Sequence, residues 1–178
     1  MSHRLFIAIR PPAPVREALL DTMEGIEGAR WQDEEKLHLT LRFAGEVERP
    51  AANDLAAALG CIAAAPFALR IAGVSHFERK GQPHTLWAGV PGDPALEALR
   101  QKVERACEAT GLGCETRRFA PHVTLARLNR SSGAIGPWIA AYSALAAGPW
   151  LVENFSLWES HLGAAGAHYE EVVRFRLG

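Results

Sequence analysis

The sequence predicts an α+β fold built from two similar halves, and three observations support this prediction. The phrase His-x-Thr-Leu occurs twice, at 38–41 and 122–125, each time inside an apolar, strand-like run. In each half, a further histidine follows the histidine of the phrase after 46 residues: His84 follows His38, and His168 follows His122. Strand-like and helix-like stretches also follow one another in a similar order in both halves. We therefore expect a duplicated chain whose halves pack about a pseudo-twofold axis and bring both phrases into one cleft.

The elements of the first half follow from local patterns. An apolar run bounded by two arginines indicates a buried strand, apolar residues at helical spacing indicate a helix, and an alanine-rich stretch indicates a second helix. Two apolar runs joined by a charged, glycine-containing segment are typical of a hairpin. In order, we expect a strand at 5–9, a helix at 12–24, the first His-x-Thr strand ending near 45, a helix at 50–62, and strands at 67–77 and 84–90 joined by 78–83.

The second half repeats the pattern. Its best-defined element is a helix at 94–110, because Asp93 suits the N-cap, Pro94 suits the first turn and Gly111 follows the last turn. After this helix we expect the second His-x-Thr strand, a helix-like segment at 135–145, and strands at 150–159 and 168–177.

Composition limits the class of protein. With 178 residues, the chain is long enough for one domain or two small lobes that share an interface. An apolar fraction of 48% and a charged fraction of 22% are those of an ordinary soluble protein. The net charge of −1 excludes the strong basic field of a tight, non-specific nucleic-acid binder. Any contact with RNA must therefore come from a local basic patch.

The cysteines and the N-terminus indicate the compartment. Cys61, Cys107 and Cys114 show neither disulfide-framework nor Cys-x-x-Cys spacing, which favours a reducing environment and argues against a zinc site. The first ten residues hold only a short apolar run before Pro11 and Pro12, so we expect no signal peptide and no membrane span. We expect a cytoplasmic protein and, since no interface signal is apparent, a monomer without an obligate protein partner.

The two phrases carry the candidate chemistry. Residues i and i+2 of a strand share a face, so His38 with Thr40, and His122 with Thr124, should surround one cavity. Histidine, with an ordinary pKa of about 6.5, acts as acid or base near neutral pH. One histidine on each side of a phosphorus atom suits in-line cleavage of a phosphate ester. The threonine hydroxyls would donate to the non-bridging oxygens.

Other site residues are hypotheses of lower specificity. Arg42 shares the strand face of the first histidine and is expected at the cleft mouth, while Arg79 and Lys80 are candidates to hold an RNA backbone. Trp87 and Phe43 are candidates for stacking on a base. The pair His84-Thr85 has the wrong spacing for the motif. No His, Cys or acidic cluster has ligand spacing, so we expect neither a metal nor another cofactor.

With both motifs in place, the chain resembles the two-histidine phosphoesterase superfamily, and within it the RNA 2′,3′-cyclic phosphodiesterases, also called 2′-5′ RNA ligases. The matching stretches are 4–9, 38–47, 118–126 and 160–169, which follow one another in the expected order over nearly the whole chain. One departure is Ala44, where members more often carry leucine; it concerns packing and leaves the chemistry unchanged.

The resemblance implies one bilobal domain over 1–178, with two antiparallel sheets about a central cleft and helices outside. It implies metal-independent hydrolysis of a terminal 2′,3′-cyclic phosphate on RNA to a 2′-phosphate, and weak 2′-5′ joining as the reverse type of reaction. It assigns His122 as base, His38 as acid and Arg118 to the phosphate. From the residues alone, the two histidine roles are interchangeable.

Two alternatives remain open at this point. The same chemistry fits a phosphodiesterase that acts on a small cyclic nucleotide. A cleft of this kind also suits a module that binds a nucleotide or RNA without turnover. Because both histidines and both threonines are present, we favour the enzyme, with RNA ends or nucleotides that carry a cyclic phosphate as its partners.

Overall fold

The computed structural model describes residues 1–178 and contains ten strands, four α-helices and one 3-10 turn. The first elements are β1 (Ser2–Ile9), α1 (Ala13–Leu20), β2 (Arg30–Trp31), the 3-10 turn η1 (Glu34–Lys36), β3 (Leu39–Glu48), α2 (Arg49–Gly60), β4 (Phe67–Ala72) and β5 (Val74–Arg79). They are followed by β6 (Gln82–Gly89), α3 (Pro94–Ala109), β7 (His122–Arg127), α4 (Gly136–Ala141), β8 (Ala146–Val152), β9 (Asn154–Gly163) and β10 (Gly166–Arg176).

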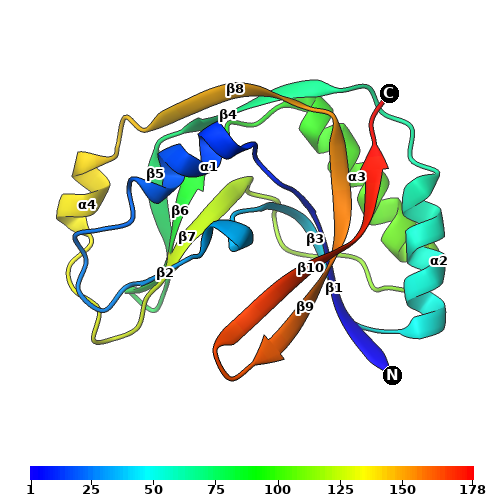
Figure 1. Ribbon diagram of the computed structural model, residues 1–178, viewed down its shortest axis with the longest axis horizontal. Coiled ribbons are helices and arrows are strands. Elements are labelled where there is room, and N and C mark those ends of the chain that lie inside the picture. Colours follow the sequence, from blue (N-terminus) through cyan, green and yellow to red (C-terminus); the bar gives the residue numbers. More distant parts are fainter.

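Eight strands form one antiparallel sheet in the order β10-β9-β1-β3-β7-β6-β5, with the short β2 beside β7. The other two strands, β4 and β8, pair with each other and run side by side along the upper edge of the molecule (Figure 1). Within the long sheet, β3 and β7 share a single residue pair, Leu39 with Val123. The sheet divides there into two wings. We call β10-β9-β1-β3 the first lobe and β7-β6-β5 the second lobe.

The two lobes exchange strands. The order strand, helix, motif strand, helix, strand, strand describes β1, α1, β3, α2, β4 and β5, and it describes β6, α3, β7, α4, β8 and β9 equally well. The last strand of each set pairs with the first strand of the other: β9 lies beside β1, and β5 lies beside β6. Each lobe therefore contains strands from both parts of the chain.

The helices cover the core side of the sheet. Helices α2 and α3 pack on each other and on β3, while α1 packs on β8. Helix α3 begins where its sequence predicts, since the Asp93 carboxylate accepts hydrogen bonds from the backbone N–H groups of Ala95 and Leu96 at 2.8 and 3.1 Å. Leu99, Val103 and Cys107 of this helix are fully buried and anchor it in the core. No helix of the chain is both long and apolar enough to cross a membrane.

The α+β class with antiparallel sheets is confirmed, and the structure corrects several boundaries. The strand expected at 67–77 is wrong as a single element: Gly73, with a φ of +73°, separates β4 from β5 and lets them enter different sheets. The strand expected at 150–159 likewise divides into β8 and β9. The helix expected at 135–145 is limited to Gly136–Ala141. The motif strands, expected on two sheets, are wings of one sheet.

Candidate active site

The two His-x-Thr motifs meet where the lobes join. Leu39 pairs with Val123 in antiparallel register, and both side chains are fully buried in the core. In this register, His38 stands opposite Thr124 and Thr40 stands opposite His122. Because neighbouring side chains alternate across a strand, these four point away from the core, on the other face of the sheet. Each histidine is therefore placed beside the threonine of the other motif.

A cleft of about 330 Å³ opens on this face. Its wall includes Thr40 and His122 from the motifs, and Phe77 and His84 from the hairpin β5-β6. Further lining residues come from β3 and from the loop 111–121 that connects α3 to β7; they are Leu41, Arg42, Phe43, Glu115, Arg117, Arg118, Phe119 and Ala120, with Arg100 of α3. His38 and Thr124 are not among the lining residues.

His38 is enclosed in an aromatic box made of Phe6, Trp158 and Tyr169. The ring of Trp158 lies edge-on at 4.4 Å between centroids, and the rings of Phe6 and Tyr169 lie at 5.9 and 5.8 Å. The residue is 5% exposed, and neither ring nitrogen has a hydrogen-bond partner within the protein. Burial lowers the pKa of His38 to about 4; the backbone carbonyl of Lys36, which lies near the ring but outside hydrogen-bond geometry, opposes this shift. At neutral pH the ring is therefore uncharged.

His122 has a more open environment. Its Nδ1 lies 2.6 Å from the carbonyl oxygen of Ala120, so Nδ1 carries the proton and donates, and Nε2 is left as an acceptor. The ring of Phe77 stands perpendicular to it at 4.9 Å, and Trp87 lies at 5.8 Å. Burial lowers the pKa of His122, the Ala120 carbonyl opposes the shift, and the charge of Arg127 adds to the lowering.

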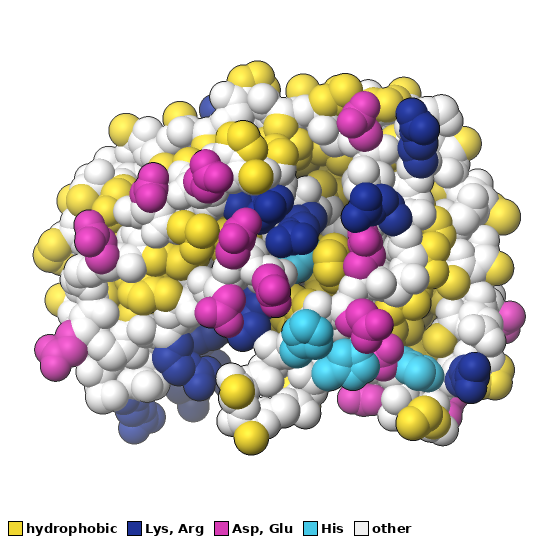
Figure 2. Space-filling view, in the orientation of Figure 1, with side chains coloured by type: hydrophobic (Ala, Val, Ile, Leu, Met, Phe, Trp, Pro, Cys, Tyr) yellow, Lys and Arg dark blue, Asp and Glu magenta, His cyan; other side chains and the backbone are white.

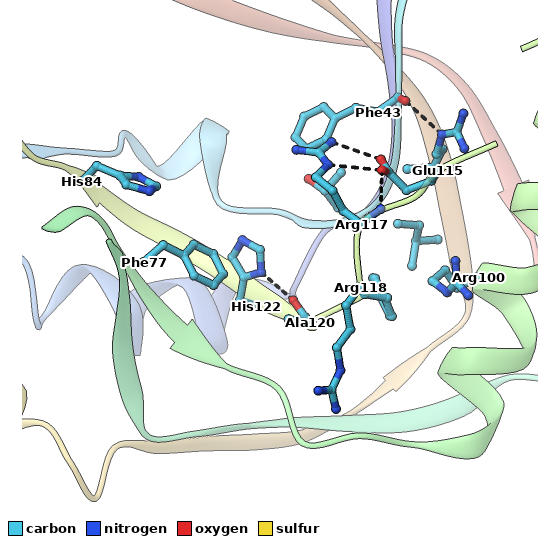
Figure 3. A pocket seen from close by; sticks show the side chains of 13 residues that line it. Phe43, Phe77, His84, Arg100, Glu115, Arg117, Arg118, Ala120 and His122 are labelled. Atoms are coloured by element: carbon cyan, nitrogen blue, oxygen red, sulfur yellow. Dashed lines mark hydrogen bonds and ion pairs between the residues drawn. The ribbon is translucent and has the colours of Figure 1, made fainter. Parts of the chain in front are cut away.

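The loop 111–121 brings cations to the cleft. Arg118, predicted to contact phosphate, lines the cleft, is exposed and makes no hydrogen bond within the protein. Arg117 points to the other side of the loop, where it donates to Glu115 at 3.1 and 3.2 Å (Figure 3). These bonds hold the pKa of Glu115 at about 2. The guanidinium of Arg100 lies 5.3 Å from the ring centre of Phe119.

Arg42 is placed differently from the expectation of a free cation at the cleft mouth. Its side chain is 8% exposed, and its guanidinium donates to the Glu104 carboxylate and to the carbonyls of Gly113 and Phe43. The same Glu104 accepts from the backbone N–H of Glu115 at 2.8 Å. Arg42 therefore fastens β3 to α3 and to the loop 111–121. Each of its three guanidinium nitrogens donates to a protein oxygen, so Arg42 belongs to the wall of the cleft.

The other proposed contacts lie around or beyond the cleft. Phe43 lines it and is 56% exposed. Trp87 is half-buried against Phe77 and His122, with an indole N–H that has no partner, and it does not line the cleft. Arg79 and Lys80 are exposed in the turn between β5 and β6, outside the lining.

Most of the remaining histidines lie away from this site. His3 and His161 pair with acidic side chains: His3 lies 2.8 Å from Glu159, and His161 lies 3.1 Å from Glu170. Figure 2 shows histidine and acidic side chains together over β9 and β10. No group of three or more His, Cys, Asp and Glu side chains is arranged to hold a metal ion.

The aromatic partners of the motif histidines have no specific signal in the sequence. Phe77 and Trp158 occupy related positions, since each belongs to the exchanged strand of its lobe and each meets a motif histidine edge-on. Their only signal in the sequence is an aromatic residue in a strand-like run, which is far more often a core position. His84, set aside for its spacing, also lines the cleft.

Comparisons with known proteins agree with this geometry. A family model described as the 2′-5′ RNA ligase superfamily matches residues 11–164. The chain is 35% identical over 128 residues to an RNA 2′,3′-cyclic phosphodiesterase of Geobacillus stearothermophilus, in a match that covers 68% of this chain and only 41% of that protein. It is 28% identical over 175 residues to one of Archaeoglobus fulgidus, covering 97% and 99%. A crystal structure from Thermus thermophilus superimposes with a TM-score of 0.78 at 28% identity, over 97% of each chain.

Proposed function

The chain belongs to the 2′-5′ RNA ligase superfamily, and on that premise we propose that it is an RNA 2′,3′-cyclic phosphodiesterase. The proposed reaction is hydrolysis of the cyclic phosphate at an RNA end to a 2′-phosphate, by acid–base catalysis between His38 and His122. Joining a cyclic end to a 5′-hydroxyl, with that hydroxyl in place of water, is proposed as a weak reverse activity of the same site.

One observation carries the proposal: the crossed register of the two motifs at Leu39 and Val123. It sets His38 opposite Thr124 and Thr40 opposite His122 at the junction of the lobes. Opening a cyclic phosphodiester forms a bond from phosphorus to a water oxygen and breaks the bond to the ribose 3′-oxygen. The first event needs a base and the second an acid, which two histidines supply.

His122 is the proposed base. The Ala120 carbonyl holds the proton of the neutral ring on Nδ1, so that Nε2 is free to take a proton from water. The lowered pKa keeps this ring neutral in the free protein at pH 7. Its position in the open cleft gives water and an RNA end access to it.

His38 is the proposed acid, but because it is buried it must first be protonated before it can donate a proton. A ring with a pKa of about 4 carries almost no proton at pH 7. A bound phosphodiester anion favours the charged imidazolium and raises this pKa, so protonation of His38 is coupled to substrate binding. The aromatic box excludes water and strengthens that coupling. Protonated His38 then donates to the departing 3′-oxygen.

The remaining groups bind the substrate. Thr40 and Thr124 donate to the non-bridging phosphate oxygens, and Arg118, with no partner in the protein, supplies a bidentate cation. Phe43, exposed on the cleft wall, offers a face for the terminal base.

The test is turnover of a short RNA that ends in a 2′,3′-cyclic phosphate, in the presence of EDTA, by the wild type, His38→Ala and His122→Ala. We expect a 2′-phosphate product from the wild type and a loss of about 10²–10⁴-fold in each variant. His161→Ala, an exposed histidine on β9, is the matched control and should keep full activity. Absence of turnover with retained nucleotide binding would instead favour the binding module, and turnover of small cyclic nucleotides alone would favour the other phosphodiesterase.

A further inference from the structure

The pair His84-Thr85 belongs to a hydrogen-bonded chain between β6 and β7, in which His84 is the member that lines the cleft. Arg127 Nη1 donates to Thr85 Oγ1 at 2.9 Å, and His84 Nδ1 lies 2.8 Å from the same oxygen. Thr85 is 1% exposed, and its hydroxyl has no other hydrogen-bond partner. Two side chains, one from β6 and one from β7, therefore converge on the buried hydroxyl oxygen of Thr85.

This chain fixes the direction of each bond. A guanidinium only donates, so Thr85 Oγ1 accepts from Arg127. The hydroxyl proton then has one acceptor within reach, which is His84 Nδ1. Neutral His84 must therefore carry its proton on Nε2. His84 and Arg127 are both exposed, and the other N–H groups of Arg127 have no partner in the protein. The arrangement presents donors and no acceptor.

Phe77 lies between His84 and the motif histidine His122. The ring of Phe77 lies 4.9 Å from the ring of His122 on one side and 6.5 Å from the ring of His84 on the other. Figure 3 shows Phe77 between the two histidines. All three residues line the same cleft. An anion held by His84 thus lies one aromatic ring away from a phosphate held at His122.

We infer that His84, oriented by the Thr85 hydroxyl that Arg127 holds in place, binds the phosphodiester that joins the last nucleotide of the RNA to the one before it. The inference rests on the proposed function, which places the terminal cyclic phosphate at His122. An RNA chain carries one phosphate per nucleotide, so a donor site further along the cleft meets the next phosphate in the strand. The site favours an oligonucleotide over a mononucleotide.

The experiment measures binding, which does not depend on turnover. Calorimetry compares the Kd of a dinucleotide with a 3′-phosphate and the Kd of a mononucleoside 3′-phosphate, for the wild type and for His84→Ala. We expect the wild type to bind the dinucleotide more tightly, and His84→Ala to lose about 10- to 100-fold on the dinucleotide only. Equal loss on both ligands, or no loss, would overturn the inference.

Two further variants serve as controls: one tests the role of the Thr85 hydroxyl without changing side-chain shape, and the other tests whether loss of any exposed histidine weakens binding. Thr85→Val keeps the shape of the buried side chain but removes the hydroxyl, and it should weaken the dinucleotide selectively by a smaller factor. His168→Ala, an exposed histidine of β10 with no hydrogen bond, should leave both affinities unchanged. If the wild type binds the dinucleotide selectively but hydrolyses no cyclic phosphate, the proposed function fails while this site stands.

Discussion

His38 and His122 occupy the same position of the same four-residue phrase, yet the structure gives them opposite surroundings. His38 is buried among three aromatic rings with both nitrogens unpartnered, whereas His122 is half-buried, faces an open cleft and has one nitrogen fixed by a carbonyl. The difference arises from the borrowed strands. The first lobe receives β9 with Trp158 and also β10 with Tyr169, while the second lobe receives only β5 with Phe77.

A motif that occurs twice in one chain therefore need not have the same chemistry in both places. The motif determines which side chains share a face of the strand. The neighbouring strands determine how polar the surroundings of each histidine ring are, which ring nitrogen carries the proton, and whether solvent reaches the ring. An open histidine with a free Nε2 is ready to accept a proton. In the proposed mechanism, an enclosed histidine with a low pKa gains its proton when an anion binds beside it. The asymmetry thus supports the proposed roles of base for His122 and acid for His38, which the shared pattern His-x-Thr-Leu leaves open.

The largest expected effect separates the acid from the base. On a cyclic phosphate, His38→Ala and His122→Ala should each lose about 10²–10⁴-fold in kcat/KM. On a nucleoside nitrophenyl phosphodiester, whose leaving group needs no proton, His38→Ala should recover most of this loss and His122→Ala should not. Steady-state kinetics on the two substrates measures both ratios. Recovery by His122→Ala instead would reverse the roles.

The second prediction concerns a residue of the first motif strand that lacks a counterpart in the second. Arg42 follows Thr40 by two residues, where the other strand carries Ala126. Removing one member of a buried ion pair leaves the other uncompensated, so Arg42→Ala should lower the free energy of unfolding by about 3–5 kcal/mol. Chemical denaturation measures the change. The double variant Arg42→Met with Glu104→Met is the control and should recover much of the loss. Recovery would be absent if Arg42 acted independently of Glu104.

The third prediction uses pH to compare the two histidines. The pKa of His38 is about 4 in the folded chain and about 6.5 when unfolded, so the unfolded state takes up a proton first as the pH falls. The free energy of unfolding therefore falls between pH 6.5 and pH 4, by up to about 3 kcal/mol, since each unit of pKa difference corresponds to about 1.36 kcal/mol. His38→Gln should remove most of this loss.

The measurement is the free energy of unfolding in urea at pH 7 and pH 4.5. His122→Gln serves as the comparison, because its ring is less enclosed and its pKa, although also lowered, should contribute less. A pH dependence that persists unchanged in His38→Gln would contradict the role of burial at that site.

The smallest expected effect comes from the two threonines. Thr40→Val and Thr124→Val each remove one donor to the phosphate oxygens, and we expect a loss of about 10²-fold in kcat/KM. Thr110→Val, which removes a hydroxyl bonded to carbonyls of its own helix, is the matched control. Equal losses would indicate that the two threonines contribute equally to binding the phosphate oxygens. An unchanged rate in either variant would remove that hydroxyl from the site.

Local patterns were sufficient to predict the parts of the fold that depend on nearby residues. The helix at 94–110 agrees with α3 because its cap, its proline and its apolar spacing lie within it. The motif strands were recognisable from the apolar, strand-like runs that contain the two phrases. The division at Gly73 was not, because a backbone turn toward another sheet leaves little trace in composition.

Distant pairings explain what the sequence could not predict about the site. Arg42 was expected at the cleft mouth, but its partner Glu104 lies on a helix far along the chain. His84 has no motif spacing, and it reaches the cleft through the pairing of β6 with β5 and β7. The aromatic box depends on β9 lying beside β1. Each of these contacts follows from tertiary pairing, which no local pattern of the chain records.

The exchange of strands between lobes also has a consequence for how the molecule acquires its activity. Trp158 and Tyr169 enclose His38 but follow it by most of the length of the chain. Pairing of β1 with β9 is among the most non-local contacts of the fold, and such contacts form slowly because a long loop must close first. During synthesis on the ribosome, His38 therefore stays solvated, with an ordinary imidazole, until β9 and β10 have emerged. If His38 acts as proposed, the nascent chain is inert toward RNA until folding is nearly finished.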